Sequence, residues 1–361
     1  MIDKLLKLVI DNGASDLHIA TNEPPILRIN GALQRTDFAA LNKEQVKTLC
    51  YSFLTKHQQE ILETTHELDL SYGVAGLGRF RINVFKDRIG YAAALRIITE
   101  TIPSLEELGL PATTKEIAKL PRGLVLVTGP TGSGKSTTLA AIIDWINTHR
   151  AEHILTIEDP IEFVHKSKKS LINQRELGND THSFSAALRS ALREDPDVIL
   201  IGEMRDLETI SLAVTAAETG HLVFGTLHTS SAASTLDRLI DVFPHEQQTQ
   251  IRIQLSNSLK AVLSQTLLKK KDGSGRSMAM EIMVVTPGIS NLIREGKTSQ
   301  IYSAIQTGRK EGMQTLEAAL AELYKKGNVR VEDLLSKSSK VDELKNLLGS
   351  DVITQEMMQT V

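Results

Sequence analysis

One glycine-rich segment, residues 129–136, constrains this chain more than any other part of its sequence. It reads Gly-Pro-Thr-Gly-Ser-Gly-Lys-Ser and matches the pattern Gly-x-x-x-x-Gly-Lys-[Ser/Thr] in full. The apolar run 124–127 precedes it and predicts a buried parallel strand. Apolar residues at helical spacing follow it, namely Leu139, Ile142, Ile143 and Ile146. A strand, a glycine-rich loop and a helix in this order form the unit that cradles nucleotide phosphates.

The residues of this loop have distinct expected roles in holding ATP. Glycine lets the backbone bend so that successive N–H groups point at phosphate oxygens. The start of the following helix adds the positive end of a helix dipole. Lys135 is expected to reach the β- and γ-phosphates, and the Ser136 hydroxyl is expected to ligate Mg²⁺. The predicted nucleotide contacts are Gly129, Pro130, Thr131, Gly132, Ser133, Gly134, Lys135, Ser136 and Thr137.

The chain has 361 residues, which is enough for two or three domains. Residues 114–285 predict an α/β domain of the RecA-like type, because apolar strand candidates alternate there with helical patterns. These strands are expected at 124–128, 153–157, 197–201 and 222–227. The proline-containing segment 99–113 is interpreted as a linker. Residues 286–361 are broken by glycines into short helices and predict a helical C-terminal region.

Residues 1–98 are expected to form a smaller α+β domain. The dipeptide Asn30-Gly31 supplies the positive φ angles of a two-residue hairpin turn. Asn42 and Thr55 are the predicted N-caps of two helices. Strands are expected at about 67–74, 79–86 and 90–98.

Charge and cysteine content exclude several classes of function. The net charge of −3 gives no overall basic excess, so no nucleic-acid partner is expected. The single cysteine, Cys50, excludes an intrachain disulfide and a cysteine-based structural zinc site, and its apolar helical setting predicts a packed thiol. No stretch approaches the roughly 20 apolar residues needed to cross a bilayer. We therefore expect a cytoplasmic protein that meets a membrane only through a partner.

Two acidic segments follow predicted buried strands. The strand at 197–201 is followed by Gly-Glu, at the strand end where ligands bind in open α/β sheets. Glu203 is therefore the carboxylate predicted to hold Mg²⁺, partly through water. The segment 157–162 carries three acids, of which Glu162 or Glu158 is predicted to activate the attacking water. An acidic turn stabilised by its own backbone is the alternative interpretation.

Two histidines, His221 and His228, bracket the apolar run 222–227. A neutral imidazole can donate a hydrogen bond to a γ-phosphate oxygen and so report its presence. His221 is therefore a candidate catalytic residue. A structural histidine at a strand end is an equally open interpretation, and a metal site is not expected because no third ligand clusters with the pair.

Together these segments resemble the secretion ATPase superfamily, which includes the motors of type II secretion and of type IV pili. The phosphate loop, the acidic box at 157–162, the Gly-Glu strand end and the histidine box at 215–228 carry the resemblance. Further signatures are 14–18, 174–176 and 192–197. The resemblance covers nearly the whole chain. The short N-terminal region and the lack of paired cysteines are typical of the type IV pilus retraction ATPases.

The resemblance implies a homohexameric ring of ATPase chains, each with a PAS-like N-terminal domain. It implies ATP hydrolysis that powers pilus retraction and twitching motility from the cytoplasmic face of the inner membrane, against a pilus platform protein. It also implies that Arg81 and Arg96 reach a nucleotide, in their own chain or across an interface. A solvated basic strand face is the alternative for these arginines.

A C-terminal signature of the retraction branch is matched at six of eight positions in residues 288–295. Gly288 stands where that signature has alanine, and Ser290 stands where it has arginine. A pilus-extension or type II secretion ATPase and a paralogous accessory retraction motor therefore stay open as interpretations. A ring subunit that binds ATP only as a regulatory switch is a third.

Overall fold

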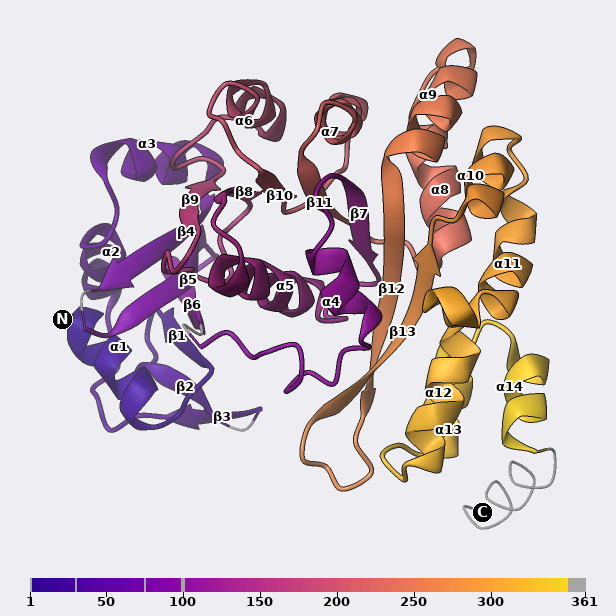
Figure 1. The fold of residues 1–361 in the computed structure, drawn as a ribbon. Helices are drawn as coiled ribbons and strands as arrows, with labels where there is room; N and C mark the ends of the chain where they lie inside the picture. Colours follow the sequence, from indigo (N-terminus) through magenta and orange to yellow (C-terminus); the bar gives the residue numbers. More distant parts are fainter. Residues whose placement is uncertain (1, 30, 75, 99–100, 350–361) are drawn as a thin grey trace. The chain divides into compact units, whose positions relative to one another are not determined.

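The computed structural model describes residues 2–29, 31–74, 76–98 and 101–349 (Figure 1). It divides into two compact units. The first comprises Met1–Thr101 and a returning segment, Pro160–Val164, and the second comprises Ile102–Asp159 and His165–Val361. The second unit thus takes in most of the segment expected as a linker and the helical C-terminal region. The finer division of the chain into four parts stays a prediction.

The first unit is built on a six-stranded antiparallel sheet in the order β3-β2-β1-β6-β5-β4. Its elements are α1 (Ile2–Asp11), β1 (Asp16–Ala20), β2 (Ile26–Ile29), β3 (Ala32–Arg35), α2 (Lys43–Tyr51), α3 (Lys56–Thr65), β4 (Glu67–Val74), β5 (Gly78–Lys86) and β6 (Tyr91–Ile98). The three strands expected at 67–98 are therefore confirmed. Gly31 lies between the paired strands β2 and β3, as the predicted hairpin requires, and Asn30 is outside the described residues.

Alternation of apolar and polar residues buries one face of this sheet. In β5, Phe80, Ile82 and Val84 are buried, whereas Arg81 between the first two is exposed. This is the period of two that a half-buried strand requires. The buried side chains form one core with apolar residues of α1, α2 and α3. The other face of the sheet is consequently left to polar and charged side chains such as Arg81.

Helices α2 and α3 begin where the sequence predicts. Asn42 and Thr55 each accept a hydrogen bond from the backbone N–H three residues later, and the glutamine side chain at that later position accepts one from the backbone N–H of the cap residue. These two capping boxes confirm both predicted N-caps. Cys50 is fully buried in the same core, which confirms the packed thiol.

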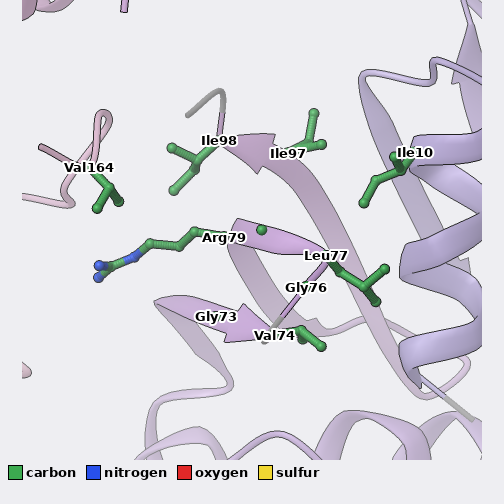
Figure 2. Close-up of a pocket in the computed structure, with 10 residues that line it drawn as sticks. Ile10, Gly73, Val74, Gly76, Leu77, Arg79, Ile97, Ile98 and Val164 are labelled. Atoms are coloured by element: carbon green, nitrogen blue, oxygen red, sulfur yellow. The ribbon is translucent and has the colours of Figure 1, made fainter. Parts of the chain in front are cut away.

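A cavity of about 690 Å³ lies beside the β4–β5 hairpin of the first unit (Figure 2). Its wall is mainly apolar, with Ile10, Leu77 and Ile97 among the lining residues. Arg79 extends from β5 with its guanidinium group on the side of Val164. Among the described lining residues there is one cationic side chain and no carboxylate. The lining of this cavity therefore differs from the predicted nucleotide site, which combines a phosphate loop with nearby carboxylates.

The second unit is built on a seven-stranded sheet in the order β13-β12-β7-β11-β10-β8-β9. Neighbouring strands are parallel from β12 to β9, and β12 and β13 form an antiparallel hairpin. The strands are β7 (Gly123–Thr128), β8 (His153–Glu158), β9 (Leu171–Glu176), β10 (Val198–Ile201), β11 (Leu222–Leu227), β12 (Leu259–Lys269) and β13 (Arg276–Val284). The helices named below are α4 (Thr113–Ala118), α5 (Lys135–His149), α6 (Phe184–Ala191), α7 (Leu207–Glu218), α8 (Ala232–Asp241), α9 (His245–Ser258), α10 (Pro287–Arg294), α11 (Ile301–Thr307), α12 (Leu316–Lys325), α13 (Val331–Lys337) and α14 (Val341–Leu348).

Both faces of this sheet are buried, as a parallel sheet requires. Side chains of β7 alternate between two cores: Leu124 and Leu126 pack with α6 to α10, whereas Val125 and Val127 pack with α4 and α5. Figure 1 shows α6 and α7 on one side of β8, β10, β11 and β7, and α4 and α5 on the other. The helices α12 to α14 pack against the β12–β13 hairpin through a separate apolar cluster. Among the helices of the described part of the chain, none has the length and apolar character to cross a bilayer.

The four strands expected in the nucleotide-binding domain are all present, as β7, β8, β10 and β11. Three further strands, β9, β12 and β13, were not predicted. In β9 the first five residues are exposed or partly exposed and only Glu176 is buried, and its sequence LINQRE has no long apolar run. The hairpin strands β12 and β13 carry leucine, lysine, alanine and methionine, residues with high helix propensity. Burial against the parallel strands overrides that propensity.

Glu281 and Glu317 are among the almost fully buried carboxylates of the second unit. Glu281 of β13 is 3% exposed and Glu317 of α12 is 0% exposed. Burial raises the pKa of Glu281 to about 7, and the negative charge of Glu317 acts in the same direction. A hydrogen bond from the backbone N–H of Ala232 and the positive charge of Lys340 oppose the shift. Glu281 therefore changes its charge near neutral pH.

We expect Glu281 to make the free energy of unfolding depend on pH. Because its folded pKa of about 7 lies above its ordinary value of 4.5, the folded state holds more protons between these values, and stability falls as pH rises through them. The full effect is about 3 kcal/mol. Urea unfolding of the wild type and of Glu281→Gln from pH 4.5 to 7.5 measures it. Two curves that run parallel over this range would contradict the assignment.

Candidate active site

The phosphate loop and Glu203 lie at the same edge of the seven-stranded sheet. Strands β7, β8, β10 and β11 are parallel, so their carboxyl ends meet at one edge. β7 ends directly before Gly129, β10 ends two residues before Glu203, and β11 ends directly before His228. This is the edge at which open α/β sheets bind their ligands.

The glycines of the loop occupy conformations that other residues rarely adopt. Gly129, Gly132 and Gly134 have φ angles of 143°, 77° and 89°. Gly134 stands before α5 and supplies no side-chain cap for the first backbone N–H groups of this helix. Those groups and the helix dipole are consequently available to an anion. Lys135 Nζ donates to the carbonyl oxygens of Gly129 at 2.8 Å and Pro130 at 3.2 Å, which holds the ammonium group against the loop.

Strand β12 forms a wall of the phosphate loop that the sequence did not indicate. A Cβ atom on Gly129 would lie 2.2 Å from the backbone oxygen of Gln265 and 2.6 Å from Ser133 Oγ. Gln265 Nε2 donates to the Ser133 carbonyl oxygen at 2.8 Å, and Arg276 Nη1 reaches the Gly132 carbonyl oxygen at 3.5 Å. Gln265 lies in a strand that was not predicted, 132 residues from Ser133 in sequence. No local signal in the sequence marks it.

Glu203 is surrounded by positive charge. Arg205 Nη2 donates to Glu203 Oε2 at 2.7 Å, and His228 Nε2 lies 3.0 Å from Glu203 Oε1. Burial acts to raise the pKa of Glu203. The hydrogen bond from Arg205 and the charges of Arg205, His228 and Lys135 outweigh it and leave the pKa below its usual value. Glu203 is thus a carboxylate at neutral pH, within the electrostatic reach of the phosphate-loop lysine.

The acids of the box at 157–162 are divided between the two units. Glu158 ends β8 and accepts hydrogen bonds from Thr156 Oγ1 at 2.7 Å and Gln174 Nε2 at 3.2 Å. Its Cα lies 3.1 Å from the position of a Cβ on Gly202, so its backbone adjoins the strand end that carries Glu203. Glu162 is exposed and belongs to the Pro160–Val164 segment of the first unit. Within the second unit, the structure therefore places the backbone of Glu158 beside the strand end that carries Glu203, and the role expected of Glu162 stays a prediction.

The two histidines of the histidine box lie at opposite ends of strand β11. His228 follows β11 and contacts Glu203. His221 precedes β11, and its Nδ1 lies 2.9 Å from the Ala216 carbonyl oxygen at the end of α7. A strand of six residues spans about 20 Å, so His221 does not meet the phosphate loop of its own chain. Within one chain, His228 is the histidine that the fold delivers to the phosphate-loop edge, and the catalytic role expected of His221 stays a prediction.

Arg81 and Arg96 lie directly opposite each other on β5 and β6 in the first unit. Both are exposed. Arg96 Nε donates to Asp16 Oδ1 at 2.8 Å, and Asp16 itself is buried. This bond uses the Nε–H donor of Arg96, and the N–H groups of its two terminal nitrogens are further donors that suit an anion. The nucleotide contact expected of both arginines stays a prediction.

The site suits Mg²⁺ bound largely by phosphate and water. Within the described residues, no three His, Cys, Asp or Glu side chains gather as a protein cage for a metal. Mg²⁺ in nucleotide sites keeps several waters and takes one or two protein ligands besides the phosphates. The Ser136 hydroxyl at the start of α5 and the ionised Glu203 fit this requirement.

Comparisons with known proteins agree with this geometry. A family model described as Type II/IV secretion system protein matches residues 1–342. The type IV pilus retraction ATPase PilT of Pseudomonas aeruginosa is 55% identical over 337 residues, which are 93% of this chain and 98% of that protein. The type IV pilus ATPase PilU of the same organism is 39% identical over 351 residues, 97% of this chain and 92% of PilU.

Solved structures show the same fold. A crystal structure of the pilus retraction motor PilT with bound ADP superposes with a TM-score of 0.90 at 50% identity and covers 95% of this chain and 98% of that one. The ATPase DotB of Legionella pneumophila gives a TM-score of 0.82 at 30% identity, over 92% of this chain and 93% of that one. The predicted α/β fold and the resemblance to secretion ATPases are thereby confirmed.

Two glycines of the phosphate loop provide a matched pair of substitutions. Both Gly129→Ala and Gly132→Ala add one methyl group at a positive φ angle. Only Gly129 lies against backbone, whereas nothing lies within 4 Å of a Cβ on Gly132. We expect Gly129→Ala to weaken the binding of a fluorescent ATP analogue at least 100-fold and Gly132→Ala to weaken it about tenfold. Equal affinities of the two variants would contradict the close approach of β12.

Proposed function

We propose that this chain, which belongs to the Type II/IV secretion system protein family and is a PilT-like type IV pilus retraction ATPase within it, powers pilus retraction and twitching motility as a homohexameric ring. The observation that carries the proposal is the meeting of the phosphate loop, Glu203 and His228 at one edge of a parallel sheet. This arrangement has the parts needed to bind ATP, hold its metal and respond to its γ-phosphate.

ATP binding is assigned to residues 129–137. Backbone N–H groups of the loop and of the first turn of α5 take the phosphate oxygens. Lys135 exchanges its bonds to the loop carbonyls for the β- and γ-phosphates, a small movement because its ammonium group already lies against the loop. Ser136 and Glu203 would hold Mg²⁺, which neutralises charge on the phosphates when bound. The ADP in the solved PilT structure supports a nucleotide at this loop.

Hydrolysis is assigned to the acids and the histidine around the γ-phosphate. Glu158 or Glu162 orients and deprotonates the attacking water. His228, held 3.0 Å from Glu203, is placed to sense the γ-phosphate through the same carboxylate. The hydrogen bonding of the His228 imidazole would change when the γ-phosphate leaves. Such a change at the end of β11 is passed on to α8, the next element of the chain.

Arg81 and Arg96 are proposed to complete the site of a neighbouring chain. A cation that arrives only when an interface closes stabilises charge on the γ-phosphate at that moment and so links chemistry to movement. In the ring, each first unit would open and close with the nucleotide state. The force would act on the inner-membrane platform protein at the cytoplasmic base of the pilus. The 55% identity to PilT, against 39% to PilU, favours retraction over an accessory role.

Mixing two inactive variants tests whether the arginines act in trans. Lys135→Ala and Arg96→Ala chains should each form rings with ATPase rates reduced about 100-fold. Mixed rings contain sites with intact Lys135 from one chain and intact Arg96 from the next, so we expect a partial return of activity. Phosphate release across mixing ratios measures it, with Arg81→Ala as a second partner. A rate of phosphate release that stays low at every mixing ratio would indicate that the arginines act in the site of their own chain.

A glutamine at position 203 tests the direction of the motor. Glu203→Gln removes the charge but keeps the shape, so we expect unchanged ATP affinity and hydrolysis slower by about 100-fold. Cells that carry it in place of the wild-type gene should show excess surface pili and no twitching. Glu246→Gln, an exposed glutamate in the first turn of α9, serves as the control. Bald cells would indicate an extension motor, and wild-type ATP turnover would remove Glu203 from the mechanism.

A further inference from the structure

Glu281 is a buried acid that the proposed mechanism does not use. It lies on β13, opposite Ser264 of β12, on the sheet face covered by α8. Its Oε1 accepts a hydrogen bond of 2.7 Å from the backbone N–H of Ala232, the first residue of α8. Burying a carboxylate until it is only 3% exposed costs folding free energy unless a hydrogen bond compensates for the lost hydration. The bond joins residues 49 positions apart, so it is a tertiary anchor and not a local cap.

The anchored residue lies four positions after His228. His228 itself begins the connection from β11 to α8, which consists of residues 228–231. Thr229 Oγ1 lies 2.7 Å from Thr235 Oγ1, and Ser231 caps the helix, so this connection is tied to the first turn of α8. The position of His228 relative to Glu203 thus depends on where α8 begins. Glu281 holds that point against the β12–β13 hairpin.

We propose that Glu281 is a positioning residue for ATP hydrolysis: by fixing the first turn of α8, it holds His228 at Glu203. This inference rests on the proposed role of Glu203 and His228 in hydrolysis. It gives the β12–β13 hairpin a second function. One face of the hairpin supports the phosphate loop through Gln265, and the other face supports the histidine through Glu281.

The C-terminal helices set the surroundings of this anchor. Glu317 of α12 accepts hydrogen bonds from Tyr302 at 3.0 Å and from the backbone N–H of Lys340 at 3.1 Å. Its negative charge and the positive charge of Lys340 both act on Glu281. Lys340 Nζ also lies 3.3 Å from the centre of the Tyr302 ring. A shift of α12 or of the segment before α14 would therefore change the electrostatic environment of the residue that holds α8.

The test compares Glu281→Met with Glu281→Gln in the full-length chain. Methionine keeps the volume and lacks the acceptor, and it replaces a buried charge with an apolar group, so the fold is expected to survive. Glutamine keeps an acceptor oxygen. We expect Glu281→Met to lower kcat about tenfold and to leave the KM for ATP within twofold, because the phosphate loop is untouched. Glu281→Gln should keep most of the wild-type kcat. A common loss in both variants, or a loss in KM alone, would overturn the proposal.

A double-substitution cycle separates this role from general destabilisation. If Glu281 acts through His228, then Glu281→Met should have little further effect on kcat in a His228→Gln chain. Additive losses would overturn the proposal. The rate of backbone hydrogen exchange at residues 228–232 tests, independently of catalysis, whether Glu281 fixes the start of α8. We expect this rate to rise at least tenfold in Glu281→Met. Unchanged exchange would refute the anchor itself. Unchanged kcat in His228→Gln alone, with faster exchange in Glu281→Met, would refute the proposed catalytic role of His228 and leave Glu281 as the anchor of α8.

Discussion

The geometry of the active edge depends on how closely β12 approaches the phosphate loop. The carbonyl oxygen of Gln265 occupies the space that a side chain at position 129 would need. Glycine is required there for room as well as for its φ angle. The same strand holds the loop through the Gln265 amide and the Ser133 carbonyl oxygen. The loop sequence is local, but its shape depends on a strand that enters the sheet 130 residues later and pairs with β7.

Two glutamates of one domain show how surroundings decide the charge state of the same side chain. Glu203 lies partly exposed beside Arg205, His228 and Lys135, and the hydrogen bond from Arg205 together with the surrounding charges holds its pKa down. Glu281 lies almost fully buried near Glu317, and burial raises its pKa to about 7. An ionised carboxylate suits the binding of a cation, whereas an acid near neutrality suits a hydrogen bond inside a core. The proposed roles of the two residues follow this difference.

Much of the fold and the phosphate loop could be predicted from sequence, because their signals are local. Continuous apolar runs marked β7, β8, β10 and β11, and Asn42 and Thr55 marked two helix starts. The strands β12 and β13 were missed because leucine, alanine and methionine favour helices, and only pairing with β7 makes them strands. His221 and His228 flank one strand, and the strand-end rule that selects Glu203 selects His228 only if that strand is parallel to its neighbours. The direction of that strand in the sheet separates them, and direction is a tertiary property.

Charge supports the proposal that the first unit acts on a nucleotide, although this unit has no phosphate loop. Arg81 and Arg96 are cross-strand neighbours, and like charges in that position destabilise a sheet. Asp16 offsets the charge of Arg96 through a hydrogen bond from Nε, which does not use the donors of the two terminal nitrogens. An anion between the two guanidinium groups would relieve their repulsion. In the proposed ring, a γ-phosphate is such an anion at the moment of closure, and its departure removes the attraction that holds the first unit at the nucleotide.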